Sequence, residues 1–350
     1  MLEKFYIGTY THKTSQGVYS VELNPEAGRL QNTQFVAAAG SPTYLAQSKD
    51  NILYAVDKET TDHETTGGLL VYDLNRTPAV KVQSTLDKGS SPAYVGVDND
   101  RDLVFTANYH TGAVSVYQIA ADGTLQLAHR VFDEGEVGPK PEQQDGPHPH
   151  YADLTPERRL VVCDLGLDLV YIYDVLNEGQ LTEVSRLQMP AGFGPRHISF
   201  DPVKNVAYLV GELSSNVATL NYDQVAGVLS IRQITHTIPS DWPTHNGAAA
   251  IRLTRDGEFL YVSNRGHNSI AVFKTHRHGE LELVQLISTE GDFPRDFNFN
   301  GDQTYLIAAN QNTDNLTLYK RDPETGKLTM LQKDYEVPEG VSVLRSDADD

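Results

Sequence analysis

The sequence contains one cysteine, no long apolar run and no surplus of positive charge, and each shortage excludes a class of protein. Cys163 is the only cysteine, so no intrachain disulfide can form and nothing indicates an oxidising compartment. No apolar run reaches the roughly 18 residues that a membrane-spanning helix needs. The net charge of −19 argues against nucleic acid and anionic membranes, because both bind basic surfaces. We therefore expect neither as a partner.

Several catalytic and metal-binding motifs are also missing. The sequence has no Gly-x-Ser-x-Gly elbow, no Walker loop, no His-Glu-x-x-His motif and no cysteine pair with metal-ligand spacing. We therefore predict no cofactor and no required metal. The first residues, MLEKFYIGTYT, do not place a basic segment before an apolar one, so we expect no secretory signal and a cytoplasmic location.

One pattern, Pro-x-x-apolar-x-apolar, recurs along the chain and indicates a repeated structural unit. Its copies begin at Pro42, Pro92, Pro149, Pro195, Pro294 and Pro338, with a degenerate copy at Ala248. Successive copies are 44 to 57 residues apart, which is close to the length of one four-stranded propeller blade. Within each unit, short alternating runs such as AVSVYQI are separated by turns rich in glycine, asparagine and aspartate, as in antiparallel strands.

The two ends of the chain complete this count. Phe5–Tyr10, Gly17–Leu23 and Leu30–Ala38 are predicted to be a second, third and fourth strand with no first strand before them. The segment PEGVSVLR, from Pro338, supplies a first strand with nothing after it. The sequence therefore predicts an all-β protein, one domain spanning 1–350. This domain is a seven-bladed β-propeller with four antiparallel strands per blade, closed by terminal strands that share one blade.

Propeller topology predicts which residues meet. The first strand of every blade lies innermost, and the loop between the second and third strands returns to the end where the first strands begin. We therefore expect these two groups to lie close together at one mouth of the channel. The first-strand starts carry His148, His150, Arg196, His197, Arg295 and Glu339. The loops carry His12, Tyr109, His110, Asp164, Glu212, Arg265, His267 and Gln311. We interpret His12, His110 and His267 as solvated, and so too the residues of the opposite turns, such as Lys49, Arg101 and Lys204.

The three arginines of the predicted mouth indicate an anionic ligand. Like charges in a partly desolvated site repel one another, and a phosphate or carboxylate, which guanidinium groups bind bidentately, relieves that cost. His148, His197 and Glu212 would supply proton acceptors. The alternative for any one arginine is a structural role, bridging blades through a glutamate or backbone carbonyls. For Asp164 the alternative is hydrogen bonding to backbone amides of its own turn.

These residues resemble the seven-bladed β-propeller lactonase family, whose characterised representative is 6-phosphogluconolactonase and to which a fungal carboxy-cis,cis-muconate cyclase is also similar. The resemblance covers essentially the whole chain. It rests on the GPRHISF block, the GELSSNV and SNRGHNSI loops, and the long segment from FPRDFNF to YLIAANQNTDNLTLYKRDPETGKL.

The resemblance implies a lactonase that hydrolyses 6-phospho-D-glucono-1,5-lactone to 6-phospho-D-gluconate in the pentose phosphate pathway. Its implied catalytic residues are His148, Glu212, Arg196 and Arg265, and its implied substrate-binding residues are His197, Arg295 and Gln311, to which the topology adds His150 and Tyr109. The expected partner is a small anionic substrate, and the expected state is a monomer or weak dimer. One alternative is a lactonase or cyclase for another carboxylated or sugar lactone. Another is a non-catalytic scaffold, which would need exposed apolar residues where this sequence has charged ones.

Overall fold

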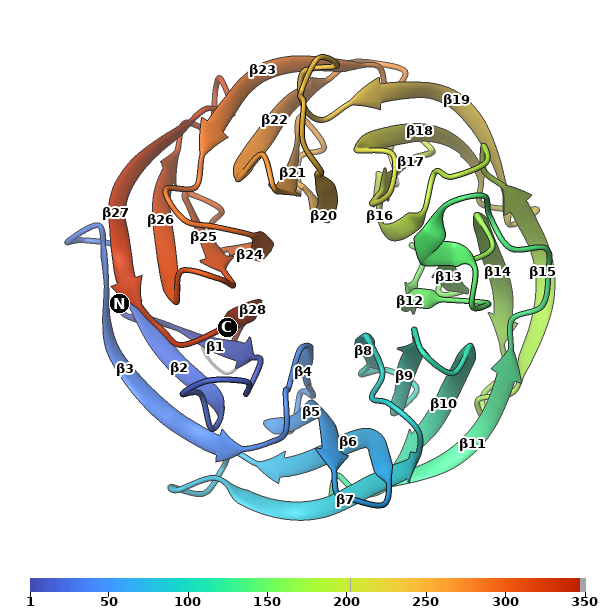
Figure 1. Cartoon of the computed structure of the whole chain (residues 1–350), viewed down its shortest axis with the longest axis vertical. Coiled ribbons are helices and arrows are strands. Elements are labelled where there is room, and N and C mark those ends of the chain that lie inside the picture. Colours follow the sequence, from blue (N-terminus) through green and yellow to red (C-terminus); the bar gives the residue numbers. More distant parts are fainter. Residues whose placement is uncertain (202, 347–350) are drawn as a thin grey trace. The chain divides into compact units, whose positions relative to one another are not determined.

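The computed structural model describes residues 1–201 and 203–346, and strands dominate this part of the chain. They form seven four-stranded antiparallel sheets (Figure 1). The one helical element among the described residues is a short 3₁₀ helix, η1 (Pro141–Gln143). Within the same residues, no helix has the length and apolar character needed to cross a membrane.

The described residues divide into two compact units. The 35–195 unit comprises Gly8–Tyr19 and Phe35–Pro195, and the 196–346 unit comprises Met1–Ile7, Ser20–Gln34 and the described residues from Arg196 onward. The prediction of one domain spanning 1–350 stays a prediction.

Three sheets lie in the 35–195 unit, each with its strands in chain order. The first contains β4 (Leu45–Gln47), β5 (Ile52–Thr60), β6 (Thr65–Asp73) and β7 (Val80–Lys88). The second contains β8 (Tyr94–Asp98), β9 (Leu103–Asn108), β10 (Ala113–Ile119) and β11 (Leu125–Phe132). The third contains β12 (Pro149–Leu154), β13 (Leu160–Asp164), β14 (Leu169–Val175) and β15 (Leu181–Gln188).

Three further sheets have the same strand order. They contain β16 (Pro195–Asp201), β17 (Val206–Gly211), β18 (Asn216–Asp223) and β19 (Val228–His236); β20 (Gly247–Leu253), β21 (Phe259–Arg265), β22 (Ser269–Thr275) and β23 (Leu281–Ser288); and β24 (Pro294–Phe299), β25 (Tyr305–Asn310), β26 (Asn315–Arg321) and β27 (Leu328–Glu336). The seventh has the order β28 (Gly340–Arg345), β1 (Glu3–Thr9), β2 (Gly17–Asn24), β3 (Arg29–Ala38). The two ends of the chain therefore share one sheet, as predicted.

The hairpin of β5 and β6 is longer than the apolar pattern predicts. The pattern ends β5 at Val56, but the pairing continues through polar residues as far as Thr60 opposite Thr65. The outer part of β5 is exposed, so no apolar face marks it in the sequence. Backbone pairing alone, without burial, extends these strands, and alternation of apolar residues cannot reveal such an extension.

The core lies between neighbouring sheets, because alternate residues of the inner strands point to opposite faces. In the 35–195 unit, Phe105 of β9 packs in one buried cluster with Val162 of β13 and Tyr171 of β14. In the 196–346 unit, Tyr261 of β21 packs in another with Phe297 of β24. These contacts fix the positions of the strand ends, which carry the predicted site residues.

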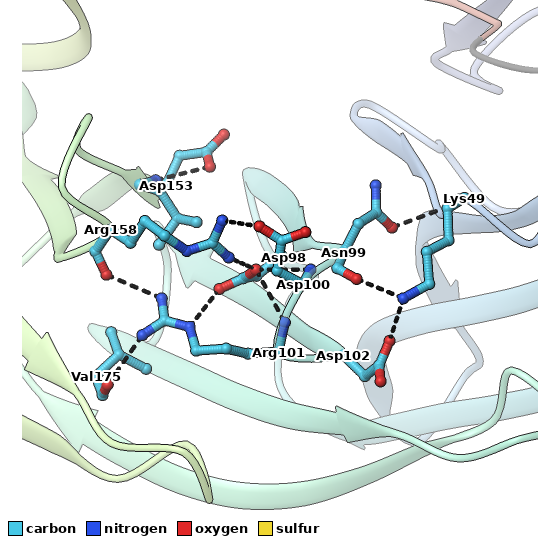
Figure 2. A network of polar contacts seen from close by, with 10 residues as sticks. Lys49, Asp98, Asn99, Asp100, Arg101, Asp102, Asp153, Arg158 and Val175 are labelled. Carbon is cyan, nitrogen blue, oxygen red and sulfur yellow. Dashed lines mark hydrogen bonds and ion pairs between the residues drawn. The ribbon is translucent and has the colours of Figure 1, made fainter. Parts of the chain in front are cut away.

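The turns between first and second strands carry polar networks rather than only solvated residues. Arg101 donates to Asp98 at 2.6 Å and to the Val175 carbonyl at 2.9 Å, while Lys49 pairs with Asp102 at 3.0 Å (Figure 2). The Arg101 side chain is only 19% exposed, so its interpretation as solvated is wrong. The interpretation of Lys204 is wrong for the same reason, since its Nζ donates to the Gly257 carbonyl and to Thr275 Oγ1. Some of the acceptors, such as the Val175 and Gly257 carbonyls, are distant in sequence, and a local sequence pattern does not show such bonds.

Candidate active site

Glu212 lies between two arginines in the 196–346 unit. It follows β17 directly, Arg196 is the second residue of β16, and Arg265 is the last residue of β21. Glu212 Oε2 is 2.8 Å from Arg196 Nε and 2.8 Å from Arg265 Nη2. Both arginine side chains are buried, and the glutamate side chain is 21% exposed. The predicted meeting of these three residues is thus confirmed within this unit.

Backbone carbonyls complete the surroundings of the two guanidinium groups. Arg196 Nη1 donates to the Ala249 carbonyl at 2.8 Å, and Arg265 Nε donates to the Gly247 carbonyl at 3.1 Å. A side chain at Gly247 would meet Arg265 Nη2 at 2.9 Å, so glycine leaves the room that this guanidinium occupies. Arg196 Nη2 makes no hydrogen bond within the described residues. This group therefore keeps a donor for a ligand, while the rest of the cluster is held by the protein.

The charges of this cluster are strongly coupled. Burial alone would raise the pKa of Glu212, but the positive charges of Arg265 and Arg196 outweigh it and lower that pKa. Burial and the neighbouring charge of Arg265 lower the pKa of Arg196 to about 9. At neutral pH the glutamate is therefore ionised and both arginines are charged, so the cluster carries a net positive charge. Such a cluster favours an anion over a neutral ligand.

His197 is buried beside this cluster and differs from it in charge. Burial, followed by the charge of Arg196, lowers the pKa of His197 well below its usual value. Arg196 Nη1 lies 3.4 Å from His197 Nε2, and because a guanidinium can only donate, this nitrogen accepts. His197 is therefore neutral at physiological pH. It can act on a ligand through a hydrogen bond but adds no positive charge.

Arg295 and Gln311 are also placed in this unit. The charge of Arg295, on β24, acts on Glu212 and Arg196, so it lies near the cluster. Gln311 follows β25, and its Oε1 is buried without a hydrogen-bond partner among the described residues. A buried amide oxygen without a partner is costly unless a ligand supplies a donor. Gln311 thus offers an acceptor for a hydroxyl group.

His148 is held on both ring nitrogens in the 35–195 unit. Its Nδ1 donates to the Tyr109 carbonyl at 2.6 Å, and its ring stacks on that of Tyr109 with centroids 4.1 Å apart. Since a carbonyl can only accept, Nδ1 carries a proton. Nε2 lies 2.8 Å from Oδ1 of Asp145, a carboxylate that is 81% exposed. His150 is buried and packs edge-on against the Tyr109 ring at 6.0 Å.

Two buried carboxyl groups, those of Asp164 and Asp133, interact with each other, and Asp164 also holds the backbone of His148. Asp164 Oδ1 accepts the backbone N–H groups of His148 and Leu167, both at 2.9 Å, which matches the alternative given for this residue. Asp133, just after β11, is also buried, and no N–H or hydroxyl group of the described residues donates to its oxygens. Burial, followed by the charge of Asp164 and a side-chain hydrogen bond to it, raises the pKa of Asp133 well above its usual value. A proton on Asp133 therefore joins the two groups.

This proton makes the stability of the protein depend on pH, and Asp133→Asn removes the dependence. Because the pKa of Asp133 is raised in the folded state, its contribution is fully present below its ordinary pKa and is lost as pH rises through the folded value. An asparagine amide can donate to Asp164 at every pH. We expect the unfolding temperature of wild type to fall more between pH 5 and pH 9 than that of the variant. The exposed Asp50→Asn variant is the control, and equal slopes in all three proteins would contradict the shared proton.

The structure thus groups the predicted residues in two sets. Arg196, His197, Glu212, Arg265, Arg295 and Gln311 belong to the 196–346 unit, and Tyr109, His148 and His150 belong to the 35–195 unit. The meeting of both sets at one mouth stays a prediction from topology. His12 and His110 are exposed as predicted, but His267 is half-buried against Trp242, with ring centroids 4.5 Å apart. Among the described residues, no three His, Cys, Asp or Glu side chains are arranged to hold a metal ion.

Two residues with evident roles were not predicted. Asp145 contacts His148 from three residues upstream, within a long connection that has no strand pattern. Phe293 lies over the Arg265 guanidinium, with Cζ 5.3 Å from the ring centroid. No sequence pattern marks either residue, because each acts through a contact that exists only in the folded structure.

Comparison with known proteins shows the family of the chain. The family described as "Lactonase, 7-bladed beta-propeller" matches residues 4–345. The chain is 43% identical over 344 residues to 6-phosphogluconolactonase of Bacillus subtilis strain 168, covering 97% of each protein. It is 52% identical to a protein from Lactobacillus plantarum of known structure, with a TM-score of 0.96, covering 99% of this chain and 100% of that one. The periplasmic gluconolactonase PpgL of Pseudomonas aeruginosa is 28% identical, with a TM-score of 0.89 and 99% of both chains covered.

The chain therefore belongs to the seven-bladed β-propeller lactonase family. Its seven sheets are the seven blades, and the predicted fold class and family are confirmed.

Proposed function

We propose that this protein hydrolyses a sugar lactone and that its substrate is 6-phospho-D-glucono-1,5-lactone. The observation that carries the proposal is the buried, net positive cluster of Arg196, Glu212 and Arg265, in which Arg196 Nη2 keeps a donor for a ligand. The family and the Bacillus subtilis relative support a lactone as the ligand. The buried oxygen of Gln311 supports a substrate with hydroxyl groups.

In the proposed reaction, the oxygen of a water molecule bonds to the lactone carbonyl carbon and its proton passes to a general base. The carbonyl oxygen becomes an oxyanion, which an arginine stabilises. The bond from the carbonyl carbon to the ring oxygen then breaks, and the ring oxygen takes up a proton to leave as a hydroxyl group. Atoms and charge balance without a cofactor, and the products are one carboxylic acid and one alcohol in the same molecule.

His148 is the better candidate for the general base. The arginines lower the pKa of Glu212, and a carboxylate stabilised in this way is a weak proton acceptor. Glu212 is better suited to compensate the two arginines and fix their positions. His148 has Nδ1 committed to a carbonyl and Nε2 on the exposed Asp145 carboxylate, so it can act as a base only when water or substrate takes the place of Asp145 at Nε2. We therefore assign proton transfer to His148 and oxyanion stabilisation to Arg196.

The phosphate is the part of the proposal that a substrate comparison tests. The likeness to PpgL, named as a gluconolactonase, favours the unphosphorylated lactone as the second candidate. The rate of ring opening of each lactone is measured from the acid released, with a pH indicator, after subtraction of the spontaneous rate. Charge-assisted hydrogen bonds to phosphate predict a kcat/KM about 10- to 100-fold higher for the phosphorylated lactone. Equal values would contradict a phosphate-binding pocket, and no acceleration of either lactone would contradict the lactonase function.

A further inference from the structure

Phe293 adopts a backbone conformation that its side chain disfavours. Its φ is +68°, in the left-handed region that residues with a bulky side chain rarely occupy. The next residue is Pro294, and a residue before proline is normally extended. A conformation of this kind persists only where surrounding contacts enforce it, and such residues gather at functional sites.

Hydrogen bonds on both sides of Phe293 enforce this conformation. Its N–H donates to Asn268 Oδ1 at 3.0 Å, and its carbonyl accepts the N–H of Gln311 at 3.1 Å. Asn268 Oδ1 also accepts the N–H of Gly266 at 3.0 Å, so one side chain ties Phe293 to the loop that follows Arg265. The segment is thus fixed to two separate loops, each of which carries a predicted site residue.

The enforced conformation places the Phe293 ring against Arg265. The Arg265 Cζ lies 5.3 Å from the ring centroid, which is within the range of a cation–π contact. Glu212 and the Gly247 carbonyl hold the edge of the same guanidinium. The ring and these edge contacts together restrict how the guanidinium can tilt. Two residues further along, the same segment carries Arg295 at the start of β24.

We propose that Phe293 is a positioning residue for lactone hydrolysis, which holds the Arg265 guanidinium in place through its ring at the cost of a strained backbone. This role rests on the proposed function. In this role the Phe293 ring acts on the reaction through Arg265, so the effect of removing the ring disappears when Arg265 is absent. A residue that merely stabilises the fold would not show this dependence.

A double-mutant cycle between Phe293→Ala and Arg265→Gln tests the proposal. We expect Phe293→Ala to lower kcat/KM for the lactone about 10-fold in the wild-type background, as expected for loss of a cation–π contact, and less than about 2-fold in the Arg265→Gln background. Phe293→Tyr keeps an aromatic ring and is expected to retain activity within about 2-fold of wild type. Unfolding temperatures of all variants show whether each one is folded.

Phe293→Gly tests the strain separately from the activity. Glycine adopts a positive φ without the steric cost of a side chain, so we expect this variant to unfold at a higher temperature than Phe293→Ala. We expect it to open the lactone as slowly as Phe293→Ala does, because both variants lack the ring. Equal fold-losses from Phe293→Ala in both backgrounds, or an unchanged rate in the wild-type background, would overturn the positioning role. A wild-type protein that opens no lactone would overturn the proposed function itself, whereas an active wild type with additive effects overturns only the role of Phe293.

Discussion

Replacing His148 by alanine is expected to lower kcat for lactone opening about 10²- to 10⁴-fold, the usual contribution of a general base. Nδ1 of His148 donates to the Tyr109 carbonyl, so the lost group is the proton-accepting Nε2. In the proposed reaction the ring transfers a proton and does not bind the anionic group of the substrate. We therefore expect KM to change much less than kcat. The measurement is steady-state kinetics of acid release, corrected for spontaneous hydrolysis.

The neighbouring His110 provides a matched control for His148. It is exposed and packs edge-on against the same Tyr109 ring, with centroids 5.2 Å apart. His110→Ala is expected to leave kcat within about 2-fold of wild type, since no proton transfer is assigned to it. Added imidazole should restore part of the activity of His148→Ala, because an external base can occupy the vacated space. Equal losses in the two variants would contradict the role of His148 as base. A higher KM with an unchanged kcat in His148→Ala would contradict it as well.

Replacing Glu212 by glutamine is expected to reduce both stability and activity. The change removes the carboxylate shared by Arg196 and Arg265 and leaves two buried guanidinium groups without their ion-pair partner. Breaking a buried ion pair by removal of one partner typically costs about 3 kcal/mol of unfolding free energy. Loss of the fixed arginine positions is expected to lower kcat/KM about 100-fold, comparable to the loss of an oxyanion donor. Urea unfolding and lactone kinetics on the same preparation measure the two effects.

The control for Glu212 is an exposed ion pair of the same chemistry. Glu183 pairs with Arg186 at 2.6 Å, with side chains 34% and 48% exposed, so Glu183→Gln should cost at most about 0.5 kcal/mol. The stabilisation by Glu212 also depends on pH. Because its pKa is lowered in the folded protein, the stabilisation is present above the ordinary value of 4.5 and is lost as pH falls through the lowered value. Equal stability of the two variants at pH 7 would contradict the compensating role of Glu212.

The repeat predicts the fold because each blade repeats the same strand order. The proline pattern locates the first strands, and the terminal segments locate the shared blade correctly. The polar extension of β5 escapes prediction, because backbone pairing without burial leaves no alternation.

Topology also predicts which residues end at which loop, and therefore brings Glu212 to Arg196 and Arg265. It does not predict charge states. His197 belongs to the predicted set, but its neutral form follows from burial beside Arg196, which depends on three-dimensional packing. The proton between Asp133 and Asp164 depends on packing in the same way. The left-handed φ of Phe293 depends on hydrogen bonds from loops distant in sequence, so a local pattern cannot reveal it.

The most direct test of the lactonase account is one set of progress curves for 6-phospho-D-glucono-1,5-lactone in the presence of a chelator. The set compares wild type with His148→Ala, Glu212→Gln and Arg196→Ala at equal concentrations of folded protein. We expect wild type to accelerate ring opening without added metal. We expect each variant to lose about 100-fold or more of that acceleration. Unchanged activity in all three variants would contradict the proposed site.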